Sequence, residues 1–297
     1  MSSFPNLRRV AILGATGWVG RTALKLLRDS DSQVMLFASR SRTEELYGAK
    51  QVIHEVNLSK LREFKPELVL DAAFLTRDKL AEMSVDSYIR ANSTIINLSL
   101  DIQQLPSIRQ FIGFSSGASL GGPGLNSKET ENADPYGSLK RHYEDALLSN
   151  SSLSEKTKIA RIWSVSGPLV TKPHLFAFSQ FIRQALEGEV VIEAAHKVWR
   201  RYVDLEDFIR VAMSASLDSS RVLDSGGNLL ELQELAERVF WTLDLPMKIS
   251  RKLEVSSIPD EYYSSNHSWN QALAETGFIP KTIEEQIRQV HQALQSR

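Results

Sequence analysis

Gly14-Ala15-Thr16-Gly17-Trp18-Val19-Gly20 is the stretch that decides the fold of this chain. It follows a short apolar run, Val10–Leu13, and leads into residues 22–27, which have the composition of a helix. Glycines at such a turn let the backbone approach a pyrophosphate, and the helix start offers free N–H groups to that anion. The spacing is G-x-x-G-x-x-G rather than the commoner G-x-G-x-x-G. The stretch predicts a dinucleotide site; a purely structural turn is the alternative.

The order of elements extends this prediction to the whole chain. Further short apolar runs at 34–37, 68–73, 111–114 and 159–163 alternate with longer amphipathic stretches. Near-continuous apolar strands separated by helices indicate a parallel sheet that is covered on both faces. We therefore expect an α/β fold, a Rossmann-type doubly wound parallel sheet.

The hydrophobic pattern of the sequence changes at Gly167-Pro168. Beyond it, apolar residues recur at helical spacing near 178–186 and 232–243, and Thr282 with Glu285 forms a capping-box pattern before a final helix. We expect a smaller, mainly helical C-terminal substrate lobe at the carboxyl edge of the sheet, where ligands of open α/β sheets bind. The predicted domains are residues 1–166, with 200–226 returning to them, and a lobe of residues 167–199 and 227–297.

Composition excludes several classes of function. The 297 residues are 42% hydrophobic and 24% charged, with a formal net charge of −1, so nothing favours nucleic acid as a partner. The absence of cysteine removes disulfides and thiol nucleophiles, and the six histidines show no metal-ligand spacing. No signal-peptide core or membrane-spanning run is visible, so we expect a cytoplasmic protein without a bound metal or membrane contact.

Tyr136 and Lys140 are the first candidates for chemistry. Asp134 is placed to cap a helix that Pro135 begins, so the two side chains, four residues apart, share one helix face. An ammonium about 4 Å from a tyrosine oxygen contributes about 4 kcal/mol at an effective dielectric near 20. That is enough to lower the tyrosine pKa by roughly three units. The pair predicts a general acid/base near neutral pH; a surface pair is the alternative.

Ser116 is the second candidate. The segment Ser115–Gly121 follows the apolar run that ends at Phe114. A hydroxyl at the carboxyl end of a parallel strand faces the ligand edge, where Ser116 can hydrogen-bond a carbonyl or alkoxide oxygen. A serine that only caps the turn fits the sequence equally well.

Together these motifs resemble the extended short-chain dehydrogenase/reductase superfamily, in its nucleotide-sugar epimerase, dehydratase and reductase branch. The resemblance covers essentially the whole chain. Besides the glycines and Tyr136/Lys140, it rests on five further matches: Ser115–Gly121, Asn92, Arg161 with Ser166-Gly167-Pro168, Arg200–Asp207, and Gly277–Pro280. The first of these corresponds to the family pattern S-S-G-A-V-Y-G, from which Ser119 and Leu120 depart.

The resemblance implies a role for each matching residue. Tyr136 would be the acid/base, Lys140 would lower its pKa and hold the nicotinamide ribose, and Ser116 would steady the reacting oxygen. Asn92, Ser116 and Arg200 would contact substrate, Arg200 through the nucleotide diphosphate, for which a guanidinium is well shaped; an ion pair with a neighbouring carboxylate is its alternative. The cofactor contacts would be Gly14, Thr16, Gly17, Trp18, Val19, Gly20, Ser39, Arg40, Tyr136 and Lys140.

The end of the second predicted strand bears on the cofactor. An acidic residue there would bind the ribose hydroxyls of NAD. This chain has Ser39-Arg40 instead, with no carboxylate before Glu44. A charge-assisted hydrogen bond from Arg40 to a 2′-phosphate is worth about 1.5–3 kcal/mol, so we expect NADP to be preferred, with NAD as the alternative. If Arg40 and Arg42 are only solvated loop residues, this preference has no basis.

The chain lacks acidic residues that one of the candidate reactions, dehydration, would need. Family dehydratases carry an acidic T-D-E triplet where this chain has Ser116-Gly117-Ala118. We therefore expect a reductase of a 4-keto-deoxysugar linked to a nucleotide. The alternatives are a nucleotide-sugar epimerase, a reductase of non-sugar carbonyls, and an NADP-binding sensor without catalysis. Relatives often dimerise, and Leu80, Met83, Tyr88 and Ile89 are candidates for such a face or for the core.

Overall fold

The computed structural model describes residues 8–121, 134–217, 221–254 and 257–296, so the N-terminal residues 1–7 lie outside the description. The chain divides into two compact units, Met1–Ile162 with Ile209–Leu223, and Trp163–Phe208 with Asp224–Arg297. The sequence had suggested that residues 200–226 return to the first domain. Residues 200–208 instead group with the second unit, because the strand Val198–Asp204 pairs only with strands outside the large sheet.

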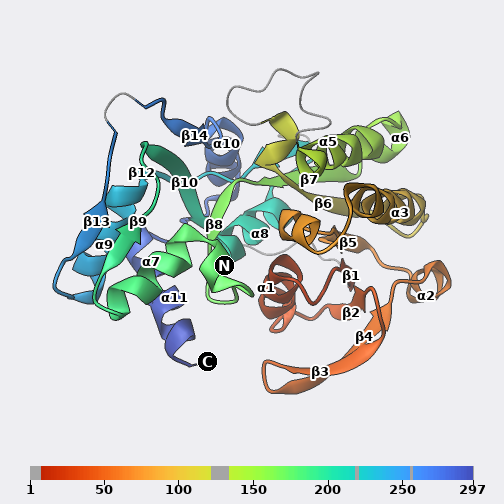
Figure 1. Ribbon diagram of the computed structural model, residues 1–297. Coiled ribbons are helices and arrows are strands. Elements are labelled where there is room, and N and C mark those ends of the chain that lie inside the picture. The colour runs from red at the N-terminus through yellow and green to blue at the C-terminus, as the bar shows by residue number, and fades with distance from the viewer. Residues whose placement is uncertain (1–7, 122–133, 218–220, 255–256, 297) are drawn as a thin grey trace. The chain divides into compact units, whose positions relative to one another are not determined.

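The first unit is built on an eight-stranded sheet in the order β11-β7-β6-β5-β1-β2-β4-β3. Neighbouring strands from β7 through β6, β5, β1 and β2 to β4 pair in parallel, which confirms the predicted Rossmann-type fold (Figure 1). Its strands are β1 (Arg9–Leu13), β2 (Gln33–Ala38), β3 (Arg42–Leu46), β4 (Ala49–Glu55), β5 (Leu68–Asp71), β6 (Gln110–Ser116), β7 (Thr157–Ile162) and β11 (Val222–Asp224). Its helices are α1 (Trp18–Leu27), α2 (Leu58–Phe64), α3 (Val85–Gln103), α5 (Pro135–Leu148) and α6 (Ser151–Ser154).

One large core cluster of this unit lies between the sheet and the helices α3 and α5. Helices α3 and α5 lie side by side over the sheet (Figure 1). Ala11 and Leu13 of β1 point into this layer, where they join Tyr88 and Ile96 of α3 and Leu147 of α5. All are almost fully buried. Tyr88, one of the residues considered for a dimer face, is therefore a core residue.

The hairpin β3–β4 is an addition that the sequence analysis did not identify. Tyr47 and Gly48 form its two-residue turn, and both have a positive φ, as a tight hairpin turn requires. Most residues of the two strands are exposed or half-buried, so the apolar alternation that usually reveals a strand is weak. Arg42, for which a solvated loop position was the alternative, begins β3 and pairs in register with Ile53.

The second unit combines helices with two small sheets. Strands β8 (Ser164–Ser166), β12 (Asn228–Glu231) and β14 (Asp260–Tyr262) surround β10 (Val198–Asp204), while β9 (Val190–Ile192) pairs with β13 (Ile249–Arg251). The helices are α7 (Ala177–Leu186), α8 (Leu205–Ser214), which continues into the first unit, α9 (Leu232–Leu243), α10 (His267–Thr276) and α11 (Ile283–Gln295). The predicted capping box of Thr282 and Glu285 is confirmed, with both reciprocal hydrogen bonds present.

No helix in the described part of the chain is long and apolar enough to cross a membrane. Among the same residues, no cluster of histidine, aspartate and glutamate is arranged to hold a metal ion.

Candidate active site

The glycine turn has the geometry that its sequence predicts. Gly14 has φ +72°, and a Cβ there would lie 2.5 Å from the Ala72 carbonyl oxygen. A Cβ on Gly20 would lie 2.3 Å from the Gly14 oxygen, so the fold itself requires glycine at both positions. Gly17, the N-cap of α1, would meet only the Gly14 oxygen at 3.5 Å. No protein atom forces glycine at position 17, which fits a backbone kept bare for a ligand.

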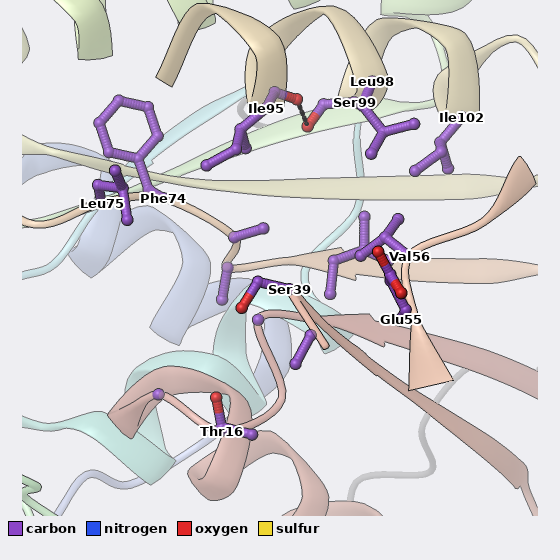
Figure 2. Close-up of a pocket in the computed structure, with 16 residues that line it drawn as sticks. Thr16, Ser39, Glu55, Val56, Phe74, Leu75, Ile95, Leu98, Ser99 and Ile102 are labelled. Atoms are coloured by element: carbon purple, nitrogen blue, oxygen red, sulfur yellow. Dashed lines mark hydrogen bonds between the residues drawn. The ribbon is translucent and has the colours of Figure 1, made fainter. Parts of the chain in front are cut away.

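A pocket of about 410 Å³ opens beside this turn, within the usual range for a small-molecule site. In Figure 2, Thr16 lies on one side and α3 on the other, with Phe74 and Leu75 towards one end and Glu55 and Val56 towards the other. Of the predicted cofactor contacts, the pocket is lined by Gly14, Thr16, Gly17 and Ser39. Those outside the lining are Trp18, Val19, Gly20, Arg40, Tyr136 and Lys140. The bare glycine turn and the helix N-terminus beside it fit a dinucleotide pyrophosphate.

Glu55 and Val56 are pocket residues that the sequence analysis missed. They lie at the carboxyl end of β4, next to Ser39 at the end of β2. The Glu55 backbone N–H donates to the Ser41 hydroxyl at 2.8 Å. The available signal was a carboxylate two residues after the apolar pair Val52-Ile53, but the polar residues of the hairpin concealed the strand.

The two arginines considered for a 2′-phosphate differ in the structure. Arg40 is exposed and forms no hydrogen bond or ion pair with any of the described residues. Arg42 pairs with Glu44 at 2.7 Å, and Glu44 also accepts from Arg21 at 3.1 Å. Arg40 is therefore available to an anion, whereas the charge of Arg42 is already matched.

Helix α5 starts as predicted, with Pro135 in its first turn, but the cap differs. The Asp134 side chain accepts no hydrogen bond from the helix backbone and instead pairs with Arg77 at 2.6 Å. The Arg77 guanidinium carbon lies 5.5 Å from the centroid of the Tyr136 ring. The start of α5 therefore presents Tyr136 beside a cation as well as beside a helix N-terminus.

Lys140 lies one turn further along α5 and is buried. Its Nζ donates to the Phe114 carbonyl oxygen at 2.8 Å, two residues before Ser116 at the end of β6. Burial lowers the pKa of Lys140 to about 8, against the attraction of the Asp71 and Glu144 carboxylates. The amine therefore stays mostly protonated at neutral pH but loses its proton at a lower pH than an exposed lysine does.

Each of these two carboxylates has its own partner. Asp71 accepts from the Tyr143 hydroxyl at 2.7 Å, and burial raises the pKa of both groups. Glu144 binds Arg161 at 2.5 Å and accepts from the Ser115 hydroxyl at 2.5 Å. Arg161, which the resemblance had matched only by pattern, thus neutralises a buried carboxylate behind Lys140.

The remaining first-unit candidates have structural contacts. Ser116 ends β6, and its hydroxyl accepts from the Ala118 N–H at 3.2 Å, the turn-capping role that was the alternative. Asn92 is fully buried; its side-chain oxygen accepts from the Leu75 N–H at 2.9 Å and its amide donates to the Leu75 carbonyl at 3.4 Å. Asn92 therefore fixes the segment after β5, which carries Phe74.

Arg200 belongs to β10 in the second unit. It pairs with Asp260 of β14 at 2.6 Å and donates to the Trp199 carbonyl at 2.8 Å. Its guanidinium carbon is 5.5 Å from the centroid of the Tyr262 ring. The ion pair weighed as an alternative is thus present, and a phosphate would have to compete with Asp260.

Comparison with known proteins places the chain in a family. Residues 10–226 match the model of the NAD dependent epimerase/dehydratase family, and the chain belongs to that family. One similar solved structure is a UDP-glucose 4-epimerase, with 18% sequence identity, a TM-score of 0.74 and 98% of each chain covered. Another is the NAD-dependent NDP-hexosamine 5,6-dehydratase TunA of tunicamycin biosynthesis, with 17% identity, a TM-score of 0.72 and 98% of each chain covered. A third is the UDP-glucose-4-epimerase of Stenotrophomonas maltophila with bound NAD and formylated UDP-arabinopyranose. Its sequence identity is 15% and its TM-score 0.73, and the match covers 97% of this chain and 98% of that one. Among curated proteins, no sequence matches this chain.

Proposed function

We propose that the protein is an NADP(H)-dependent oxidoreductase that reduces the 4-keto group of a nucleotide-linked deoxysugar. One observation carries the proposal: Tyr136 and Lys140 of α5 both contact the ring of Phe74, which follows β5 and also lines the pocket beside the glycine turn. Phe74 thus lies between a candidate proton donor and a candidate dinucleotide pocket, all within the first unit of the fold.

The residues of the chain account for the proton transfer. When bound, the nicotinamide supplies the hydride. The Tyr136 hydroxyl donates a proton to the carbonyl oxygen as that oxygen gains charge, and the Lys140 ammonium favours the tyrosinate that remains. Arg77 also lies beside the Tyr136 ring, but its charge is paired with Asp134, so Lys140 is the cation assigned to this role. Ser116 aids the same oxygen if its hydroxyl leaves the turn.

Two side chains decide the cofactor. Arg40 has no hydrogen-bond or ion-pair partner among the described residues, which supports binding of a 2′-phosphate. Glu55 lines the pocket and would repel that phosphate if it faced the same ribose. Arg40→Ala should weaken NADPH binding about tenfold to a hundredfold and leave NADH binding unchanged. Arg62→Ala on α2 is the matched control, and an unchanged NADPH dissociation constant in Arg40→Ala would remove the NADP preference.

The substrate assignment rests on the family and on Arg200. The similar structures include proteins with bound UDP-sugars, and a guanidinium suits a diphosphate. If the substrate carries a diphosphate, Arg200→Ala should raise KM with little change in kcat. A reductase of a non-sugar ketone would not need this residue.

The direct test mixes the protein with NADPH and a nucleotide-linked 4-keto-6-deoxysugar and follows cofactor absorbance and sugar mass. Loss of one NADPH for each gain of two hydrogens supports the reductase. Epimerisation of an intact nucleotide sugar without net cofactor loss would support the second candidate, which is favoured by the likeness to UDP-glucose 4-epimerases. Tight NADPH binding with neither reaction would support a sensor.

A further inference from the structure

Phe74 contacts both members of the tyrosine–lysine pair. It follows β5, in the segment that Asn92 fixes through Leu75. The Lys140 Nζ lies 3.8 Å from the centroid of its ring, and the ring meets that of Tyr136 edge-on with centroids 5.9 Å apart. Phe74 lines the pocket, whereas Lys140 does not. The ring is therefore a wall of the pocket that covers the amine.

Such a ring acts on the amine in two opposite ways. The face of an aromatic ring attracts a cation and so favours the charged lysine. The same ring excludes water, and loss of hydration disfavours the charged form. Lys140 is only 5% exposed, so both effects operate at nearly full strength.

The Phe74 ring is the nearer of two aromatic rings beside the amine, since the centroid of the Tyr143 ring lies 5.3 Å from Nζ. Within the described residues, Nζ donates a hydrogen bond only to the Phe114 carbonyl. The ionisable groups near it are Asp71 on β5 and Tyr143 and Glu144 on α5, with Arg161 of β7 bound to Glu144. The two carboxylates are already engaged by a tyrosine hydroxyl and a guanidinium, and within the described residues neither forms an ion pair with Lys140.

We propose that Phe74 is a positioning residue: its ring holds the Lys140 amine against the Phe114 carbonyl and determines how readily that amine carries charge. The inference rests on the proposed function, because it assigns the ring a part in the same proton transfer. Phe74, an apolar residue that lines the pocket, would then influence the charge of Lys140 in addition to packing against it.

Two substitutions separate the two effects of the ring because they act in opposite directions. Phe74→Leu keeps water out but removes the aromatic face, so the Lys140 amine should titrate about half to one pH unit lower. Phe74→Ala admits water, so the amine should titrate about one unit or more higher, towards the value of a free lysine. Phe74→Tyr retains the ring and should restore the wild-type titration.

The readout is nitrogen NMR of the lysine side chains across pH, with the Lys140 signal assigned by its loss in Lys140→Met. Phe64→Leu, a partly buried phenylalanine packed against the same core, is the matched control and should leave the signal unchanged. This titration requires no substrate, so it succeeds or fails independently of the proposed reaction. The alkaline limb of the pH–rate profile should then shift with the signal.

Opposite shifts in the leucine and alanine variants, with wild-type behaviour in Phe74→Tyr, support the proposal. Titration of all three variants at the wild-type pH would make Phe74 a packing residue and overturn it. Shifts in the same direction for leucine and alanine would also overturn it, because the aromatic face would then have no effect of its own. If Phe74→Ala does not fold, the contrast between Phe74→Leu and Phe74→Tyr decides in the same way.

Discussion

Lys140 in the first unit and Lys281 in the second lie near two carboxylates each, yet their surroundings act on them in opposite directions. Lys281 binds both of its carboxylates directly, Asp204 at 3.0 Å and Asp207 at 2.5 Å. Burial opposes its charge, but the two ion pairs outweigh burial and raise the pKa of Lys281. Burial prevails at Lys140 and lowers its pKa to about 8.

The difference lies in what else the carboxylates bind. Near Lys140, Asp71 is held by Tyr143 and Glu144 by Arg161, so neither closes on the amine. Near Lys281, Asp204 accepts from backbone N–H groups at the start of α8 and from the lysine Nζ, whereas Asp207 accepts from both the backbone N–H and the Nζ of Lys281. Burial still raises the pKa of Asp204, so desolvation exceeds the attraction at that carboxyl. The same residue types thus form a fixed structural cluster in one place and leave an amine free to change protonation in the other.

The largest expected effect separates the two lysines by activity. Lys140→Met should lower turnover on the order of 100-fold or more, because Tyr136 loses the cation that favours its ionised form. Lys281→Met should leave turnover per folded molecule unchanged. The measurement is kcat at a temperature where both variants are folded by circular dichroism. Equal losses in the two variants would show that the comparison misassigns Lys140.

Stability should show the reverse order. Lys281→Met leaves two buried carboxylates without their cation and should cost about 3–5 kcal/mol of unfolding free energy. Lys140→Met should cost much less, because Asp71 and Glu144 keep their own partners. Urea unfolding at neutral pH measures both, and Lys281→Arg is the control that retains the charge. A larger loss in Lys140→Met would contradict this account.

The pH dependence of stability should distinguish the lysines by sign. Lys140 has a lower pKa in the folded state than the usual 10.5, so the folded protein binds fewer protons than the unfolded chain between about pH 8 and 10.5. Wild-type stability relative to Lys140→Met should therefore rise by about 3 kcal/mol across that window. Lys281, with a raised pKa, stabilises the fold below about pH 10.5 and loses this contribution above it. Unfolding at several pH values tests both signs; parallel curves for wild type and Lys140→Met would contradict the first.

The smallest effect comes from making Lys140 resemble Lys281. Tyr143→Phe removes the hydroxyl that Asp71 accepts from, which leaves that carboxylate to interact with the lysine. The alkaline limb of the pH–rate profile should shift upwards by about half to one unit, with a stability cost of about 1–2 kcal/mol. Tyr88→Phe removes a buried hydroxyl bonded to the Leu75 carbonyl instead and is the control. An unchanged limb in Tyr143→Phe would mean that Asp71 does not act on Lys140.

The sequence was sufficient where the structure depends on near neighbours. Gly14 and Gly20 contact each other across one turn, so their spacing alone predicted the fold of that segment. Tyr136 and Lys140 share a helix face by periodicity. The contacts that define the site join distant segments: Asp71 meets Tyr143 across 72 residues, and Arg200 meets Asp260 across 60. A sequence pattern over a few residues does not predict which distant segments come together. The sequence therefore did not predict that Phe74 and Glu55 line the pocket.

The most direct test of the central claim, that Tyr136 moves the proton in a nicotinamide-linked reaction, compares wild type with Tyr136→Phe. Cofactor affinity is measured by quenching of intrinsic fluorescence, and turnover by NADPH absorbance with the keto-sugar substrate. The account predicts an unchanged NADPH dissociation constant and a turnover reduced by roughly 100- to 10,000-fold. Unchanged turnover would contradict it and remove Tyr136 from the mechanism.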